Sequence, residues 1–244
     1  MKFTKMHGCG NDFVLVEGAA DLTAAQARDL CDRRRGIGAD GVLAIGAARG
    51  RCWPVTIHNA DGSLGGSCGN GARCAARYLL DRHGGDELEL SFSGGDVKAR
   101  RQGRDIAIAL ASPAAPESLA LDGMRAYRVS LGNPHLVIFV ADPAEADLTA
   151  LAAAARAAVG QTNVEVARVV GADLILLRVD ERGVGETLAC GTGACATVAA
   201  ARSEQPMSER VTVRVPGGDL LIRPGPRTYE LAGPAEYVFE GSTR

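Results

Sequence analysis

The sequence carries one short pattern twice, and the two copies are half a chain length apart. The first copy is Cys68-Gly69-Asn70-Gly71-Ala72, and the second is Cys190-Gly191-Thr192-Gly193-Ala194, 122 positions later in a chain of 244 residues. Gly10-Asn11 recurs as Gly132-Asn133 at the same offset. Segments that recur in one order at a constant offset indicate a duplication, and two copies are too few for a solenoid. The sequence therefore predicts two similar domains related by a pseudo-twofold axis, with Cys68 and Cys190 facing each other.

Each copy is followed by an alanine-rich run that is typical of a helix. Glycines at a helix start let the chain turn sharply and leave backbone N–H groups uncovered. These groups and the helix dipole favour a thiolate at the preceding cysteine, and they can also hold a carboxylate. We therefore interpret Cys68 and Cys190 as thiols of lowered pKa that serve one small anionic substrate. A buried structural role is the alternative for any cysteine, and we expect it for Cys74 and Cys195 inside the helical runs.

Composition excludes several classes of function. The net charge is −2 and 4% of the residues are aromatic, whereas a nucleic-acid interface needs clustered positive charge and often stacking rings. No apolar run reaches membrane-spanning length, and the N-terminal residues lack the apolar core of a signal peptide. We therefore expect a cytoplasmic protein that binds neither nucleic acid nor membranes, and whose seven cysteines are thiols. The cysteine spacings within the repeats, six and five residues, match no metal site, so we expect no metal.

Hydrophobic patterning predicts several strands and two helices in each half. In the first half we expect strands at 2–17 (two strands around a glycine turn), 42–45, 51–57, 87–92 and 97–110, and helices at 23–34 and from 68 to 83. In the second half we expect strands at 125–140 (again two), 164–170, 174–180, 211–215, 219–223 and 228–232, and helices at 147–159 and after 190. Strands and helices do not alternate regularly, so the fold class is α+β.

The stretch at 112–116, Ser-Pro-Ala-Ala-Pro, is the best candidate for a linker between the halves. We therefore place the two domains at 1–114 and 115–244. Whether the C-terminal strand crosses to the first half is left open.

Six motifs in their order make the chain resemble the diaminopimelate epimerase family. They lie at 6–13 (MHGCGNDF), 59–63 (NADGS), 68–74 (CGNGARC), 132–135 (GNPH), 181–187 (ERGVGET) and 189–196 (ACGTGACA). The resemblance implies that each domain is a mixed sheet curled around a central helix, with the active site between the domains. It also implies inversion at the α-carbon of LL-diaminopimelate to the meso form, a step of lysine and cell-wall precursor biosynthesis. We expect no metal, no pyridoxal phosphate and no other cofactor. A homodimer is a further hypothesis.

The resemblance also assigns roles to individual residues. It makes Cys68 and Cys190 the catalytic pair, and it places His135 and Glu181 near them, where they tune the thiol pKa values. The implied substrate-binding residues are Asn11, Asn59, Gly69, Asn70, Asn133, Asn163, Glu181, Arg182, Gly191 and Thr192. These roles agree with the chemistry, because inverting a stereocentre by proton exchange needs a base on one face and an acid on the other. Backbone N–H groups at the two helix starts would stabilise the charge that develops on the substrate carboxylate.

Three positions depart from the family pattern and leave substrate choice open. His58 stands where an aromatic residue is usual, Gly65-Gly66 where acidic or larger residues are common, and Gly41 where some members have glutamine. The alternative hypothesis is therefore that the protein is a racemase or epimerase of another amino acid, such as histidine or lysine. Arg182 argues for diaminopimelate, since an amino acid with a single head offers this side chain no second carboxylate. A third hypothesis is a non-catalytic thiol sensor or binding protein, which would not need helix-start glycines at both cysteines.

Overall fold

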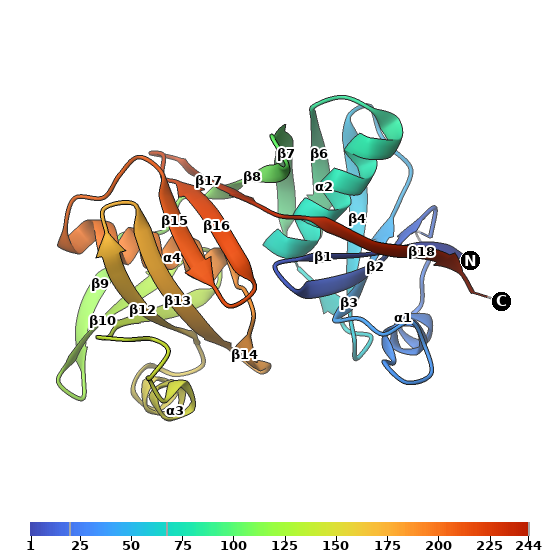
Figure 1. The fold of residues 1–244 in the computed structure, drawn as a ribbon. Helices are drawn as coiled ribbons and strands as arrows, with labels where there is room; N and C mark the ends of the chain where they lie inside the picture. The colour runs from blue at the N-terminus through green and yellow to red at the C-terminus, as the bar shows by residue number, and fades with distance from the viewer. Residues whose placement is uncertain (20, 67, 244) are drawn as a thin grey trace. The chain divides into compact units, whose positions relative to one another are not determined.

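The chain folds into two compact units (Figure 1). A computed structural model describes residues 1–19, 21–66 and 68–243. The first unit comprises Met1–Ile108 together with the final segment from Gly233, and the second comprises Ala109–Ala232. The linker inferred from the sequence, at 112–116, therefore lies a few residues inside the second unit.

The first unit is a mixed sheet. Its strands are β1 (Lys2–Gly8), β2 (Asn11–Glu17), β3 (Gly41–Ile45), β4 (Cys52–Asn59), β5 (Leu64–Gly65), β6 (Glu87–Phe92), β7 (Gly95–Gln102), β8 (Asp105–Ala111) and β18 (Glu236–Ser242). The pairings run β18–β1–β2–β3–β4–β6–β7–β8, and the short strand β5 also pairs with β4. The pairs β2–β3 and β4–β6 are parallel and the others are antiparallel.

The second unit repeats this strand order. Its strands are β9 (Glu117–Leu121), β10 (Met124–Ser130), β11 (Pro134–Phe139), β12 (Asn163–Gly171), β13 (Leu174–Glu181), β14 (Gly185–Thr187), β15 (Val211–Val215), β16 (Gly218–Arg223) and β17 (Thr228–Gly233). The order is β9–β10–β11–β12–β13–β15–β16–β17, and its parallel pairs are β11–β12 and β13–β15. The short strand β14 pairs with β13, as β5 does with β4. The predicted α+β fold of two similar domains is confirmed, and β18 takes the place in the first unit that β9 has in the second.

Each sheet is wrapped around one long helix (Figure 1). Helix α2 (Gly69–His83) contacts β1, β2, β3, β6 and β7, and helix α4 (Gly191–Glu204) contacts β10, β11, β12, β13, β15 and β16. From Gly193 to Ala201 every residue of α4 is buried, which is the pattern of a helix enclosed by other elements rather than lying on a surface. Half of the residues of α4 are alanine or glycine, so the strands can approach this helix closely. Cys74 and Cys195 have no exposed surface, in agreement with the structural role expected for them.

The other two helices are shorter. Helix α1 (Ala24–Cys31) packs on β3 and β4, and helix α3 (Leu148–Val159) packs on β9, β12, β13 and β14. The predicted capping box at the start of α1 is present, since Thr23 and Gln26 each bond the other's backbone N–H. However, α1 ends before residue 34, because the Asp32 carboxylate accepts the N–H groups of Arg34 and Arg35 at 2.8 Å and turns the chain.

The strand prediction was wrong in two respects. The stretch 97–110 is two strands, β7 and β8, because Gly103 adopts a φ of +63° and closes a tight turn between them. The prediction also missed β5, β9, β14 and β18, which are short or largely exposed and so lack a clear apolar alternation. Within the described residues, every helix is too short or too polar to cross a membrane.

Candidate functional site

Both repeated cysteines cap a helix in the same way. Cys68 precedes α2 in an extended conformation (φ −146°), and its sulfur accepts the N–H of Gly71 at 3.5 Å. Cys190 precedes α4 with φ −121°, and its sulfur accepts the N–H of Gly193 at 3.4 Å. The two thiols therefore occupy the site at which a helix stabilises negative charge.

In the first unit, Asn11 joins Cys68 to the start of α2. Asn11 Oδ1 accepts from the Cys68 thiol (3.7 Å) and from Asn70 Nδ2 (3.4 Å). Asn11 Nδ2 donates to Asp40 Oδ2 at 2.8 Å, so the carboxylate fixes which way the amide faces. Cys68, Gly69, Asn70 and Asn11 thus form one cluster in which the amide oxygen points toward the thiol.

A network of two cations and two anions supports this cluster. Asp12 pairs with Lys5 at 2.6 Å and with Arg33 at 2.8 Å, and Arg33 also pairs with Asp40 at 2.8 Å. Burial alone would raise the pKa of Asp12, but the hydrogen bonds from Arg33 and Lys5 outweigh it and lower this pKa well below its usual range. Arg33 thus joins Asp12 and Asp40 through ion pairs, and the second oxygen of Asp40 accepts from Asn11.

In the second unit, Cys190 contacts a hydroxyl and a carboxylate. Its sulfur lies 3.4 Å from Thr192 Oγ1, which accepts from Asn133 Nδ2 at 3.4 Å. Glu181 makes a hydrogen bond with Cys190 and accepts from Thr187 Oγ1 at 2.6 Å. Burial raises the pKa of Glu181, although these two hydrogen bonds act in the opposite direction. Asn133, Glu181, Gly191 and Thr192 are therefore brought together with Cys190, as their places in the sequence predict.

The ionisation of Cys190 differs from the expectation based on the helix start. Burial raises the pKa of Cys190 well above its ordinary value, and the charges of Glu181 and Glu165 add to this effect. Hydrogen bonds from Thr192 and Gly193 lower the pKa, in the predicted direction, but they are outweighed. A helix N-terminus therefore does not make this cysteine a thiolate.

The remaining predicted positions have different surroundings. Asn163 is buried, and its Oδ1 accepts the backbone N–H of Arg182 at 2.9 Å. Arg182 is exposed, and within residues 1–19, 21–66 and 68–243 its guanidinium forms no ion pair, so its charge is available to a ligand. Asn59 is exposed and donates to Ser63 Oγ at 2.9 Å within the turn that follows β4. That turn contact is the local role typical of asparagine.

His135 and His58 are both buried, but only one has a charged partner. His135 Nδ1 lies 2.6 Å from Glu165 Oε1, and neither side chain has exposed surface. His58 is 5% exposed, and its Nδ1 has no hydrogen-bond partner in the described part of the chain. Burial lowers the pKa of His58, which keeps this side chain neutral within β4. His58 therefore fills an interior position of β4.

Sequence reasoning missed three residues that support the site. Asp40 orients Asn11, Glu165 pairs with His135, and the fully buried Arg73 donates to Asn70 Oδ1 at 2.9 Å and to Cys9 Sγ at 3.7 Å. Arg73 was visible inside the CGNGARC motif, but nothing in the pattern indicated that it faces inward. Glu165 alternates with apolar residues in β12, and that pattern predicted only a strand.

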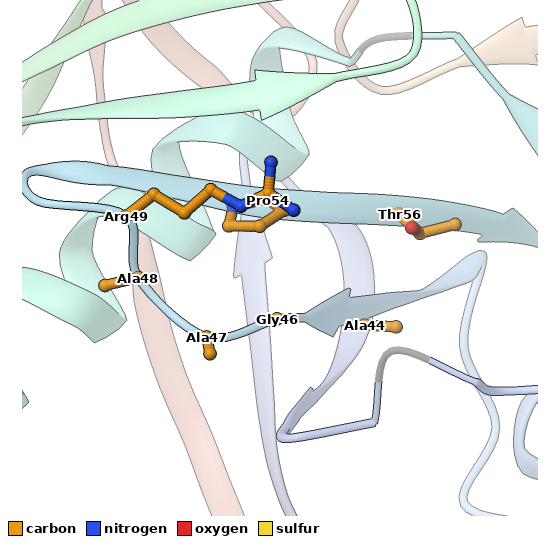
Figure 2. A pocket seen from close by; sticks show the side chains of 7 residues that line it. All are labelled: Ala44, Gly46, Ala47, Ala48, Arg49, Pro54 and Thr56. Atoms are coloured by element: carbon orange, nitrogen blue, oxygen red, sulfur yellow. The ribbon is translucent and has the colours of Figure 1, made fainter.

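The first unit also has a surface hollow that is lined by residues outside the candidate site (Figure 2). It has a volume of about 330 Å³ and is formed by β3, β4 and the turn between them, with Arg49, Pro54 and Thr56 among its lining residues. None of the predicted site residues lines it, and Arg49 is its one ionisable side chain. Across the described residues, no group of three or more histidine, cysteine or acidic side chains is arranged to hold a metal ion.

Solved structures with the same fold come from several families. A phenazine biosynthesis protein of the PhzF family from Enterococcus faecalis superposes with a TM-score of 0.77 at 13% identity, over 100% of both chains. A hydroxyproline epimerase from Agrobacterium vitis superposes with a TM-score of 0.68 at 14% identity, over 99% of this chain and 91% of that chain. At such low identity these likenesses establish the fold alone.

Sequence comparison is more specific. The family model described as diaminopimelate epimerase matches residues 3–110 and 127–236. The diaminopimelate epimerase of Synechocystis sp. is 38% identical over 99% of this chain and 98% of its own length. That of Xanthomonas axonopodis pv. citri is 40% identical over 99% of this chain and 95% of its own length. By these matches over nearly its whole length, the chain belongs to the diaminopimelate epimerase family.

Proposed function

We propose that this protein interconverts LL- and meso-diaminopimelate by proton exchange at one α-carbon, without a cofactor. The observation that carries the proposal is the pair of cysteine helix caps, one in each unit, in a chain of the diaminopimelate epimerase family. One thiolate removes the α-proton, and the other thiol delivers a proton to the opposite face of the carbon. This division follows from stereochemistry, because inversion removes the proton from one face of the carbon and delivers a proton to the opposite face.

The intermediate must be stabilised, since an α-proton next to a carboxylate is only weakly acidic. When the C–H bond breaks, its electron pair delocalises into the carboxylate, which gains negative charge. N–H groups at Gly69-Asn70 and Gly191-Thr192 open the two helices and have no intrahelical acceptor, so they suit this charge. The second thiol then supplies a proton to the carbon, and the carboxylate returns to its original charge.

Recognition of diaminopimelate requires a site for its second amino-acid head. Arg182 suits the distal carboxylate, because a guanidinium can form two parallel hydrogen bonds with it. Asn163 supports this role by holding the backbone N–H of Arg182. Asn11, Asn59, Asn133 and Glu181 supply acceptors for the two ammonium groups. Lysine and histidine have no second carboxylate, so a racemase of either would leave Arg182 unpaired.

The test is an isomerisation assay with diaminopimelate, lysine and histidine as separate substrates, with chiral chromatography of the products. We expect turnover of diaminopimelate, and rates with lysine and histidine lower by at least about 100-fold, as for a site whose polar groups are left unpaired. The untreated protein and protein dialysed against a chelator should give the same rates. Racemisation of lysine or histidine as fast as diaminopimelate epimerisation would overturn the substrate assignment and favour a racemase of another amino acid.

A further inference from the structure

The first turn of α4 packs directly against a buried carboxylate. A Cβ atom placed on Gly193 would lie 2.5 Å from Glu165 Oε1, so only glycine allows this approach. Glu165 Oε1 is 2.6 Å from His135 Nδ1, and both side chains are fully buried. Gly193 is also the residue whose N–H bonds the sulfur of Cys190. Glu165 therefore lies at the same positive helix end that would stabilise a thiolate on Cys190.

The first unit has an apolar pair at the equivalent place. In the parallel pair β2–β3, Phe13 and Leu43 hold the positions that His135 and Glu165 hold in β11–β12, each 122 residues earlier. A Cβ on Gly71 would meet Leu43 Cδ2 at 3.2 Å and Phe13 Cζ at 3.4 Å. The backbone arrangement is thus shared by the two units, and the buried carboxylate is particular to the second.

Two further ionisable side chains lie near Glu165 and Cys190. Glu181, on β13, adds a second carboxylate on the side of the thiol, and His135, on β11, faces Glu165. The other charged side chains on strands that pack against α4 are exposed or paired elsewhere: Arg125 with Glu204, Arg128 with Glu117, Arg156 with Asp180, Arg178 with Glu186, Arg214 with Asp219, and Arg168 and Arg223 at the surface. Glu165 and Glu181 are thus two acidic groups that raise the pKa of Cys190, and His135 pairs with the first of them.

We propose that Glu165 is a positioning residue that disfavours the thiolate of Cys190, so that Cys190 holds its proton more firmly than Cys68 in the resting enzyme. A negative charge at a helix start competes with a thiolate for the same N–H groups, and like charges at short range disfavour each other. His135 holds the carboxylate of Glu165 in place through its Nδ1 contact. Burial and both carboxylates raise the pKa of Cys190, which agrees in direction with this geometry.

The proton balance of the cycle follows from this assignment, which in this respect rests on the proposed function. In the direction in which Cys68 is the base, its thiolate takes the α-proton and becomes a thiol, while Cys190 gives its proton to the opposite face and becomes a thiolate. In the reverse direction the two thiols exchange roles. A thiolate beside Glu165 is unfavourable, so Cys190 takes a proton from solvent and Cys68 releases one. The enzyme then returns to its starting form without any oxidant, reductant or cofactor.

The test measures ionisation at each thiol without substrate. Cys68→Ala and Cys190→Ala variants each leave one of the pair, and iodoacetamide labelling followed by peptide mass spectrometry gives the rate at the remaining thiol as a function of pH. The pH midpoint of this curve reports ionisation, whereas accessibility scales the whole curve. We expect a higher midpoint for Cys190 than for Cys68. Equal midpoints, or the reverse order, would overturn the proposal without any change at Glu165.

Variants then isolate the carboxylate. Glu165→Leu, which installs the residue of the first unit, should lower the midpoint of Cys190 by about 1 pH unit or more and leave that of Cys68 unchanged. The double variant His135→Phe/Glu165→Leu reproduces the apolar pair Phe13–Leu43, so it keeps the test available if the single variant folds poorly. Glu186→Leu removes an exposed carboxylate of the same unit and should shift neither midpoint. A Cys190 midpoint that does not move in the folded Glu165 variants contradicts the proposal.

Activity provides a second readout. Loss of the Cys190 proton at high pH should set the basic limb of kcat/KM, so Glu165→Leu should move this limb to lower pH by about the same 1 unit. A purely structural role for Glu165 would lower stability without moving the limb. If the labelling midpoints follow the expected order but diaminopimelate is not epimerised, the proposed function fails while the assignment of Glu165 stands.

Discussion

Replacing Cys68 or Cys190 with alanine is expected to reduce epimerisation of diaminopimelate by about 10²–10⁴-fold, the usual contribution of a positioned acid or base. Each thiol caps a different helix, so we expect the loss of one to leave one face of the α-carbon without its proton donor or acceptor. The measurement is kcat/KM in both directions for each variant. A folded variant of either cysteine that retains wild-type turnover would contradict the two-thiol mechanism.

The matched controls for this prediction are the two other cysteines of the repeats. Cys74 and Cys195 are fully buried within α2 and α4, and burial raises the pKa of Cys74 to about 12, so it is a packed thiol. Cys74→Ala and Cys195→Ala should keep kcat/KM within a few-fold of the wild type. Each should instead lower the free energy of unfolding by about 1 kcal/mol, a typical cost for a point substitution. Urea denaturation separates this loss of stability from a loss of catalysis.

Replacing Arg182 should weaken recognition of diaminopimelate more than it affects folding. Arg182 is exposed and its backbone N–H, rather than its side chain, makes the contact with Asn163. We expect Arg182→Ala and Arg182→Lys to lower kcat/KM by about 30-fold, which corresponds to about 2 kcal/mol for a charged hydrogen-bonding partner. Lysine is a poor replacement because its ammonium cannot bind a carboxylate through two parallel hydrogen bonds.

The control for Arg182 is Arg168→Lys, which changes an exposed arginine on β12 of the same unit. This variant should keep the kinetics of the wild type and the same melting temperature. The preference for diaminopimelate over lysine should also fall in Arg182→Ala, because the side chain that distinguishes them is gone. Unchanged KM and unchanged preference in Arg182→Ala would show that the distal carboxylate binds elsewhere.

The internal repeat made much of the fold predictable. Equivalent residues such as Asn11 and Asn133 lie at the same offset as Cys68 and Cys190, and the structure gives both units the same strand order and the same helix start. Helix ends were less predictable, because Asp32 terminates α1 through side-chain bonds that depend on the local path of the chain. The short strands β5 and β14 depend on pairing with β4 and β13, which no local pattern reveals.

The sequence predicted which groups form the site, but it did not predict the pKa of Cys190. Glycines beside Cys190 correctly indicated a helix start, yet the pKa of its thiol depends on Glu165 and Glu181, which approach from other strands. Comparison of the two halves position by position would have singled out Glu165, because its counterpart is the apolar Leu43. A duplicated sequence therefore contains a usable signal of function in the positions at which its halves differ in charge.

The most direct test of the two-thiol account follows hydrogen at the α-carbon in heavy water. Unlabelled LL-diaminopimelate is incubated with the enzyme in D₂O, and deuterium in substrate and product is measured by mass spectrometry in the first few per cent of conversion. The account predicts a meso product that carries one deuterium from the first turnover, because the second thiol holds a solvent-derived deuteron, and a remaining substrate without label. Equal labelling of substrate and product from the start, or an unlabelled product, would mean that a single group serves both faces.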